Sequence, residues 1–166
     1  MTEELDQLLR NLHLKKILEI ADEEIRLANQ DQIPYQDFLL RLIRPQWHAR
    51  QEKALGWRIK NAGLPELFTL ETFPFKQQPG VNKRQIQTLA ELDFIPRAEN
   101  VILIGPTGVG KTGLASALLL KALENGYRGR FVRAQDLFDD MYASLADRSS
   151  RKLIDRLARL DVLLVD

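Results

Sequence analysis

The sequence Gly105-Pro106-Thr107-Gly108-Val109-Gly110-Lys111-Thr112 matches the phosphate-binding pattern G-x-x-x-x-G-K-[ST]. Glycines at these places let the backbone curl so that successive N–H groups surround phosphate oxygens, and a following helix adds its N-terminal dipole. Lys111 would bring positive charge to the β- and γ-phosphates, and the Thr112 hydroxyl would bind Mg²⁺. The alternative is a glycine-rich strand-to-helix turn with a solvated lysine, which requires several residue types to coincide by chance. All eight residues are therefore predicted to bind a nucleoside triphosphate.

A second element, residues 160–166, is an apolar strand that ends in a carboxylate. An acid at this place beside a phosphate-binding loop holds Mg²⁺, directly or through water. That role suits Asp166, whereas Asp161 opens the strand and is interpreted as a solvated turn residue. Many apolar strands simply end in Asp as they enter a turn, so the assignment depends on the preceding loop. Lys111 and Asp166 are the predicted catalytic residues, and Thr112 and Asp166 are the predicted metal ligands.

Hydrophobic periodicity predicts helices in the first sixty or so residues. Residues 5–28 carry an apolar stripe that fits one or two amphipathic helices. Residues 38–43 form a second short helix, which Pro45 is expected to stop or kink. A third helix covers about residues 46–61 and is followed by Gly63, a plausible helix stop.

The pattern changes after residue 98, where short apolar runs alternate with helical ones. Residues 101–104 are predicted to form a strand buried on both faces, because they are apolar and rich in β-branched side chains. Strands separated by helices predict an α/β fold with a parallel sheet. The other predicted elements are strands at 130–133 and 162–165 and helices at 113–125, 135–146 and 150–160.

Residues 64–96 form a connector that prolines interrupt, with a short helix predicted only at 85–93. Phe73 and Phe75 flank Pro74 in this connector. They are interpreted as anchors for the core or the linker, or alternatively as walls of an adenine pocket.

The net charge is only +1, from 24 basic and 23 acidic residues, so nucleic-acid binding must rest on a local cluster. Residues 41–60 contain six basic side chains against the single acid Glu52, with two tryptophans between them. This cluster predicts contacts with DNA phosphates, while a solvated helix face with tryptophans packed inward remains an alternative. A weaker basic group at 148–159 is diluted by acids and predicts no site by itself. The predicted DNA contacts are Arg50, Lys53, Arg58 and Lys60.

Cysteine is absent, which excludes a disulfide framework, a thiolate zinc site and a cysteine nucleophile. His13 and His48 lack metal-ligand spacing. The first ten residues are acidic where a signal peptide is basic, and no apolar run approaches the roughly 18 residues of a membrane span. We expect a soluble, cytoplasmic protein with no membrane partner.

The sequence resembles the IstB-like helper ATPases of insertion sequences, in the helicase-loader and initiator branch of AAA+ proteins. The resemblance covers nearly the whole chain, and its most specific parts are the helical opening LHLKKILEIADEEIRLANQDQIPYQDFLLRLI and the connector AGLPELFTLETFPF. It implies a P-loop NTPase fold with a three-layer parallel sheet, of which this chain holds the first half after a small all-α module. The expected divisions are residues 1–63 for the module, 64–98 for the connector and 99–166 for the first half of the ATPase domain.

The resemblance also implies a function. The helical module would mediate self-association into a homo-oligomer, and the ATPase units would assemble around duplex DNA and present it to a partner transposase. ATP and Mg²⁺ would be the cofactors, with water attacking the γ-phosphoryl group in the intact protein. The alternatives are a replicative helicase loader, a catalytically dead nucleotide- or DNA-binding remnant, and a P-loop small-molecule kinase.

Two features depart from the family pattern. Gly113 stands where a histidine or another side chain is expected, and an early helical glycine costs about 0.5 to 1 kcal/mol relative to alanine. The catalytic acid, sensor strand, arginine finger and C-terminal helices that follow the Walker B aspartate in the family do not follow Asp166. We therefore expect a piece of a longer protein, with hydrolysis near background by itself. In the family, a later strand lies between the P-loop strand and the Walker B strand. Without that strand the sheet would have a gap, and apolar surface at 101–104 and 162–165 would be exposed.

Overall fold

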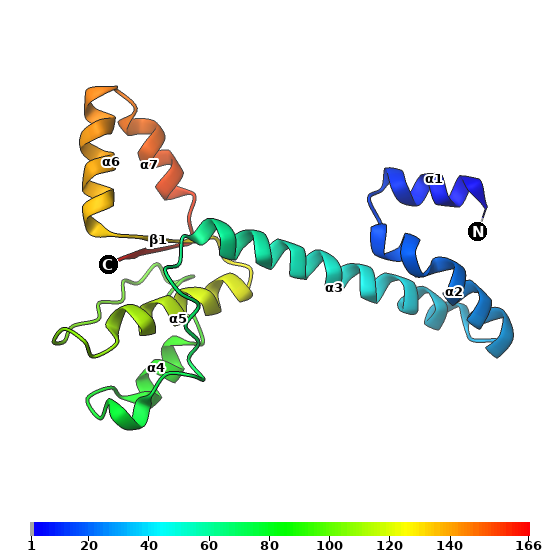
Figure 1. The fold of residues 1–166 in the computed structure, drawn as a ribbon, viewed down its shortest axis with the longest axis horizontal. Coiled ribbons are helices and arrows are strands. Elements are labelled where there is room, and N and C mark those ends of the chain that lie inside the picture. Colours follow the sequence, from blue (N-terminus) through cyan, green and yellow to red (C-terminus); the bar gives the residue numbers. More distant parts are fainter. Residues whose placement is uncertain (1) are drawn as a thin grey trace. The chain divides into compact units, whose positions relative to one another are not determined.

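The computed structural model describes residues 2–166 and divides into two compact units, the first ending at Ala54 and the second covering Leu55–Asp166. Figure 1 shows the succession of helices and strands along the chain. No helix among residues 2–166 is both long and apolar enough to cross a membrane.

The first unit is helical, as predicted. It contains α1 (Glu3–Asn11), α2 (Lys15–Asp31) and the beginning of α3 (Tyr35–Ala62). The stripe at 5–28 thus forms two helices. Their core consists of buried Leu9, Ile17 and Ala21, against which half-buried Leu14, Leu18 and Leu42 pack.

Helix α3 continues through Pro45, so the prediction of two separate helices at 38–43 and 46–61 was wrong. Proline removes one helical hydrogen bond, but its fixed φ is compatible with a helix. Contacts on both sides hold the segment: Leu42 packs against the core, and Gln46 Oε1 accepts hydrogen bonds from the backbone N–H groups of Lys16 (2.9 Å) and Ile17 (3.4 Å). Gln46 thereby caps the start of α2, and these tertiary contacts outweigh the local preference of proline.

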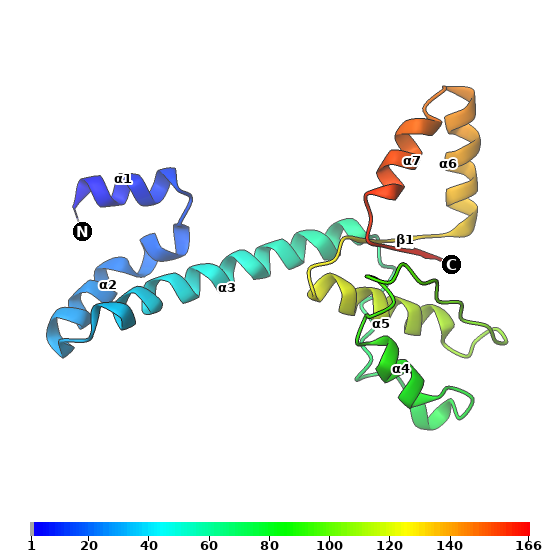
Figure 2. The ribbon, with the colours of Figure 1, turned by 180° about the vertical axis from the view of Figure 1, so that it is seen from behind.

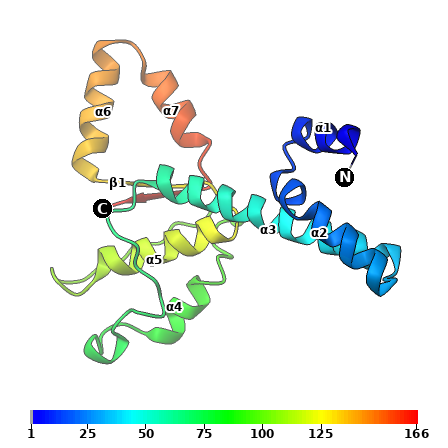
Figure 3. The same ribbon diagram turned by 45° about the vertical axis from the view of Figure 1, so that its right-hand side comes forward.

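The second unit is built around a parallel pair of strands, β1 (Gly129–Val132) and β2 (Val162–Val165), as the sequence predicts. Helix α5 (Lys111–Glu124) packs against both strands and lies between them and α4 (Lys83–Leu89), as Figure 3 shows. A methyl group at Gly129 would overlap Leu119 of α5, so the absence of a side chain there permits the close packing. The buried residues of α5, most of them apolar, form the core of this unit. Its buried residues are Leu114, Ser116, Ala117, Leu118, Leu119, Leu120, Ala122 and Leu123.

The connector contains the 3-10 helix η1 (Phe75–Gln77) and the helix α4. Helix α4 overlaps the helix predicted at 85–93, but it begins two residues earlier and ends four residues earlier.

Between β1 and β2 the chain forms α6 (Ala134–Ala146) and α7 (Ser150–Ala158), which lie side by side as a hairpin in Figure 2. The Ser150 hydroxyl donates to the Ser144 carbonyl oxygen (3.1 Å) where the two helices meet.

Asp161 is not merely a solvated turn residue, contrary to the sequence-based interpretation. Its carboxylate accepts the backbone N–H of Arg128 (2.7 Å) and two guanidinium hydrogen bonds from the same residue (3.0 and 3.1 Å). These hydrogen bonds hold the pKa of Asp161 below its usual value. Because Arg128 precedes β1 and Asp161 precedes β2, the pair aligns the starts of the two strands.

The prediction of a buried strand at 101–104 was wrong. This segment forms no strand, and Ile102 and Ile104 are 79% and 92% exposed. A groove of about 600 Å³ separates residues 101–103 from β2, with residues of α5 also lining it. Since a strand requires a neighbour for its backbone hydrogen bonds, the segment stays irregular. Of the apolar residues expected to be exposed, Val101, Ile102, Ile104, Leu163 and Val165 are exposed, whereas Leu103, Val162 and Leu164 are half-buried.

The two glycines at the start of α5 should respond oppositely to alanine. A methyl group at Gly113 would lie 3.5 Å from Phe68 Cδ1, an ordinary contact, so Gly113→Ala should raise the free energy of unfolding by about 0.5 to 1 kcal/mol. At Gly110 the φ of +83° disfavours a side chain, and a methyl group would lie 3.0 Å from Phe73 Cε2. Gly110→Ala should therefore lower the free energy of unfolding by about 1 kcal/mol or more. Urea denaturation of both variants tests the contrast, and equal shifts would contradict it.

Candidate functional site

The loop at 105–110 leads directly into α5. Gly108 and Gly110 have φ of +84° and +83°, the left-handed region that glycine adopts without strain. Gly110 is also the N-cap of α5, and neither a side-chain cap nor an acidic residue occupies the first turn. The first backbone N–H groups of a helix have no partner within the helix, and the dipole there favours anions. The loop and helix start thus have the features of an anion-binding site.

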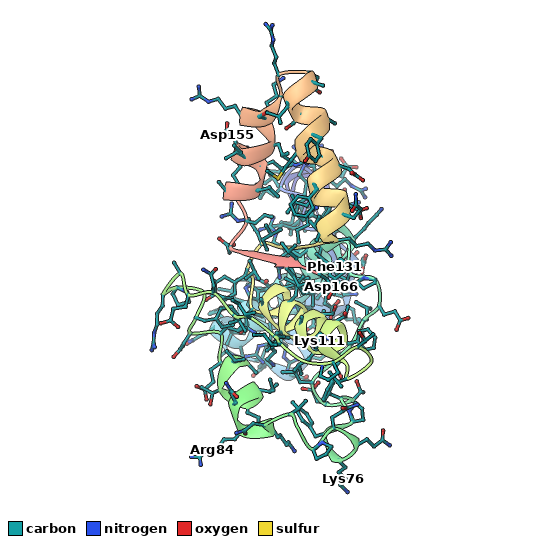
Figure 4. All side chains as sticks on the ribbon, turned by 90° about the vertical axis from the view of Figure 1, so that its left-hand side faces the viewer. Lys76, Arg84, Lys111, Phe131, Asp155 and Asp166 are labelled. Carbon is teal, nitrogen blue, oxygen red and sulfur yellow. The ribbon has the colours of Figure 1, made fainter. Side chains whose placement is uncertain are left out.

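Lys111 lies across the loop that precedes it. Its ammonium group donates hydrogen bonds to the carbonyl oxygens of Gly105 (2.9 Å) and Pro106 (2.7 Å). An ammonium has three donors, so these two bonds leave one for another acceptor. Figure 4 labels Lys111, the first residue of α5, and Asp166, and both residues line the same groove.

Thr112 and Asp166 are in direct contact, although 54 positions separate them in sequence. The Thr112 hydroxyl lies 2.9 Å from Asp166 Oδ1 and 3.1 Å from Oδ2, and it donates to this carboxylate. The backbone of Asp166 is fixed as well: its N–H donates to the Val132 carbonyl (3.1 Å), and its own carbonyl accepts the N–H of Ala134 (2.8 Å). The strand pairing therefore sets where this carboxylate lies.

The oxygen atoms of Thr112 and Asp166 fit a magnesium ion. Mg²⁺ prefers hard oxygen ligands and is usually held by one or two protein groups together with substrate phosphates and water. Within residues 2–166, no group of three or more His, Cys, Asp or Glu side chains is arranged to hold a metal by itself. The hydroxyl and the carboxylate would supply two ligands, and phosphate oxygens and water would complete the coordination.

The four predicted DNA contacts do not form one set. Arg50, Lys53 and Lys60 are exposed on α3, whereas half-buried Arg58 donates a hydrogen bond from Nε to the carbonyl oxygen of Leu123 (2.8 Å). Arg58 therefore differs from the other three, because a backbone carbonyl of the second unit holds its guanidinium. Arg58 serves instead as a cationic cap for the C-terminal end of α5.

The tryptophans near the basic cluster do not pack inward, contrary to the alternative interpretation. Trp47 is 55% and Trp57 is 65% exposed. Trp57 and Lys60 are three residues apart in α3 and therefore lie on one face of the helix.

Sequence reasoning missed two contacts around the site. The rings of Phe68 and Phe73 lie against Gly113 and Gly110, at the start of α5. The aromatic residues of the connector were visible as candidate anchors, but nothing in their spacing identified the surface they would contact.

Comparison with known proteins identifies the family. A family model described as IstB-like ATP binding protein matches residues 7–166. A protein from Pseudomonas aeruginosa, named as an ATP-binding protein of insertion sequence IS21, is 34% identical over 163 residues, which cover 98% of this chain and 62% of the relative. A corresponding protein of IS5376 from Geobacillus stearothermophilus is 32% identical over 166 residues, covering 100% of this chain and 66% of the relative.

A third relative, an IS21-like ATP-binding protein from Bacteroides fragilis strain YCH46, is 31% identical over 163 residues, which cover 98% of this chain and 82% of that protein. The chain spans slightly less than two thirds of the length of the first two relatives. The family match extends over both units and includes the loop and Asp166. The chain therefore belongs to the family of IstB-like ATP binding proteins.

Proposed function

We propose that this chain binds Mg²⁺-ATP between the 105–112 loop and the end of β2. The observation that carries the proposal is the contact between the Thr112 hydroxyl and the Asp166 carboxylate, 2.9 Å apart, at the start of the helix that follows the loop. This contact places side by side the hydroxyl and the carboxylate that would bind a magnesium ion held by the nucleotide phosphates.

Each residue of the loop has a distinct role in this proposal. Backbone N–H groups of residues 105–112, except Pro106, which has none, surround the phosphates, and Lys111 exchanges a loop carbonyl for a β- or γ-phosphate oxygen. Thr112 and Asp166 hold Mg²⁺, which supplies charge neutralisation to the phosphates. In the whole protein Lys111 would offset charge on the γ-phosphoryl group as water attacks it.

We further propose that the protein is an ATP-dependent helper in insertion-sequence transposition, with a transposase and duplex DNA as partners. The names of the relatives, which assign them to insertion sequences, support transposition over the loading of a replicative helicase. We also propose that the protein acts in the cytoplasm, because its proposed partner is DNA.

The helical unit is proposed to mediate self-association. Leu5 and Leu8 of helix α1 and its C-cap residue Leu12 are exposed at a spacing that places them on one face. The first part of α3 exposes a further apolar set. Apolar surface of this extent favours association with another protein surface. The exposed α3 residues are Tyr35, Leu39, Leu40, Ile43 and Trp47.

The DNA contacts are proposed to be Arg50 and Lys53 of the first unit and Lys60 of the second, with Trp57 beside Lys60 on the helix. Their side chains are exposed, so their charges are available to phosphates. Arg58 is left out of the proposed set, because it caps α5 through the Leu123 carbonyl.

Lys111→Ala should abolish most binding of Mg²⁺-ATP, because the phosphates lose the positive charge that lies over the loop. We expect the dissociation constant to rise by about a hundredfold, the equivalent of about 2.7 kcal/mol. Titration with a fluorescent ATP analogue measures it. Lys121→Ala, which removes a lysine from the opposite end of α5, is the matched control and should bind as the unmodified chain does. Unchanged affinity in Lys111→Ala would refute nucleotide binding at this loop.

The affinity for duplex DNA should fall steeply with salt, with a log–log slope of about −0.9 for each phosphate contacted. Replacing Arg50, Lys53 and Lys60 by alanine should flatten this slope by about 2 to 3 units if each contacts one phosphate. Fluorescence anisotropy at several salt concentrations measures the slope.

The control for the DNA experiment removes the same charge from elsewhere on the surface. Lys76, Arg84 and Lys152 are exposed and lie outside α3, so replacing these three by alanine should leave the slope nearly unchanged. Equal slopes for the α3 variant and the unmodified chain would assign the α3 residues to a solvated helix face.

A further inference from the structure

The connector contacts the phosphate-binding loop through the ring of Phe73. A methyl group built at Gly110 would lie 3.0 Å from Phe73 Cε2 and 3.4 Å from Cζ, so the ring lies directly against the glycine backbone. Gly110 is the N-cap of α5 and immediately precedes Lys111. The contact thus falls where the loop ends and the helix begins.

The orientation of Phe73 is fixed by its own neighbours. Pro74 has φ −80° and ψ 63°, and the N–H of Phe75 donates to the Phe73 carbonyl (2.8 Å), which closes an inverse γ-turn. The rings of Phe73 and Phe75 meet edge to face, with centroids 4.8 Å apart and planes at 63°. Lys83 Nζ lies 5.6 Å from the centroid of the Phe75 ring.

These contacts form a path from α4 to the loop. Lys83 is the first residue of α4, whose start is capped by Asn82 Oδ1 through the N–H groups of Arg84 (3.1 Å) and Gln85 (3.2 Å). From Lys83 the path passes through Phe75 and Phe73 to Gly110. The side chain that reaches the loop is thereby anchored to a regular element.

The rest of the loop has less support. Gly105 meets only Val109 and Lys111, both from the loop region, and Gly108 has no neighbouring atom near the place of a side chain. Glycine loses more conformational freedom on folding than any other residue, so a loop of this composition is costly to hold in one shape. Of these three glycines, Gly110 alone contacts a side chain from a distant part of the sequence.

We propose that Phe73 is a positioning residue for the phosphate-binding loop. Its ring restricts Gly110 to the left-handed conformation and so sets the direction in which α5 starts and Lys111 leaves the loop. It acts through Gly110 and needs no contact with nucleotide. The inference deepens the proposed ATP site and rests on it for its effect on affinity, but the restriction of the loop exists without nucleotide.

The test compares Phe73→Ala with Phe73→Tyr, which keeps the ring, and with Phe68→Ala, a matched loss of a ring that lies on Gly113 beyond the loop. Hydrogen exchange of the backbone amides in residues 105–112, without nucleotide, reports the order of the loop. Binding of Mg²⁺-ATP is measured in parallel, and thermal unfolding verifies that each variant is folded. If Phe73→Ala does not fold, Phe73→Leu replaces it, since leucine keeps the apolar bulk without the flat ring.

We expect Phe73→Ala to speed exchange in the loop and weaken Mg²⁺-ATP binding by about tenfold each, the scale of one aromatic contact. Phe73→Tyr and Phe68→Ala should stay within about twofold of the unmodified chain. Unchanged loop exchange in Phe73→Ala overturns the inference whether or not ATP binds. If the unmodified chain does not bind ATP but Phe73→Ala still exchanges faster in the loop, the proposed function is refuted and the positioning role remains.

Discussion

Packing of α5 against β1 and β2 brings the parts of the candidate site together. Eight residues of the helix are buried, and Leu119 approaches Gly129 so closely that a side chain there would overlap it. Burial of this apolar surface is the main favourable contribution to the second unit. The first residues of α5 then lie beside the residue that follows β2. Loop and carboxylate thus meet because one helix packs against two paired strands.

Smaller interactions refine this arrangement at each end. Arg128 and Asp161 align the starts of the strands, while the Asp166 backbone continues the pairing to Val132 and Ala134. Arg58 caps the end of α5. Hydrogen bonds to charged groups are individually modest when exposed, so their value here is in geometry more than in stability.

Local sequence patterns were sufficient to predict the helices α1, α2 and α5 and the strand β2. The sequence was insufficient where contacts between residues far apart in the chain determine the local structure. Pro45 continues a helix because Leu42 and Gln46 hold it from both sides, and residues 101–104 remain irregular because no strand lies beside them. The proximity of Thr112 to Asp166 followed from the P-loop pattern. The contact of Phe73 with Gly110 followed from no pattern of residue types.

The proposed nucleotide site depends most directly on Thr112 and Asp166 acting as one magnesium-binding pair. A double-mutant cycle with Thr112→Val and Asp166→Asn measures this, using ATP affinity with Mg²⁺ and with the metal chelated. With Mg²⁺, each single variant should lose about tenfold in affinity and the double variant little more, since both losses come from one ion. With the metal chelated, all four proteins should bind ATP alike. Losses that multiply in the double variant, or that persist without Mg²⁺, would contradict a shared magnesium site.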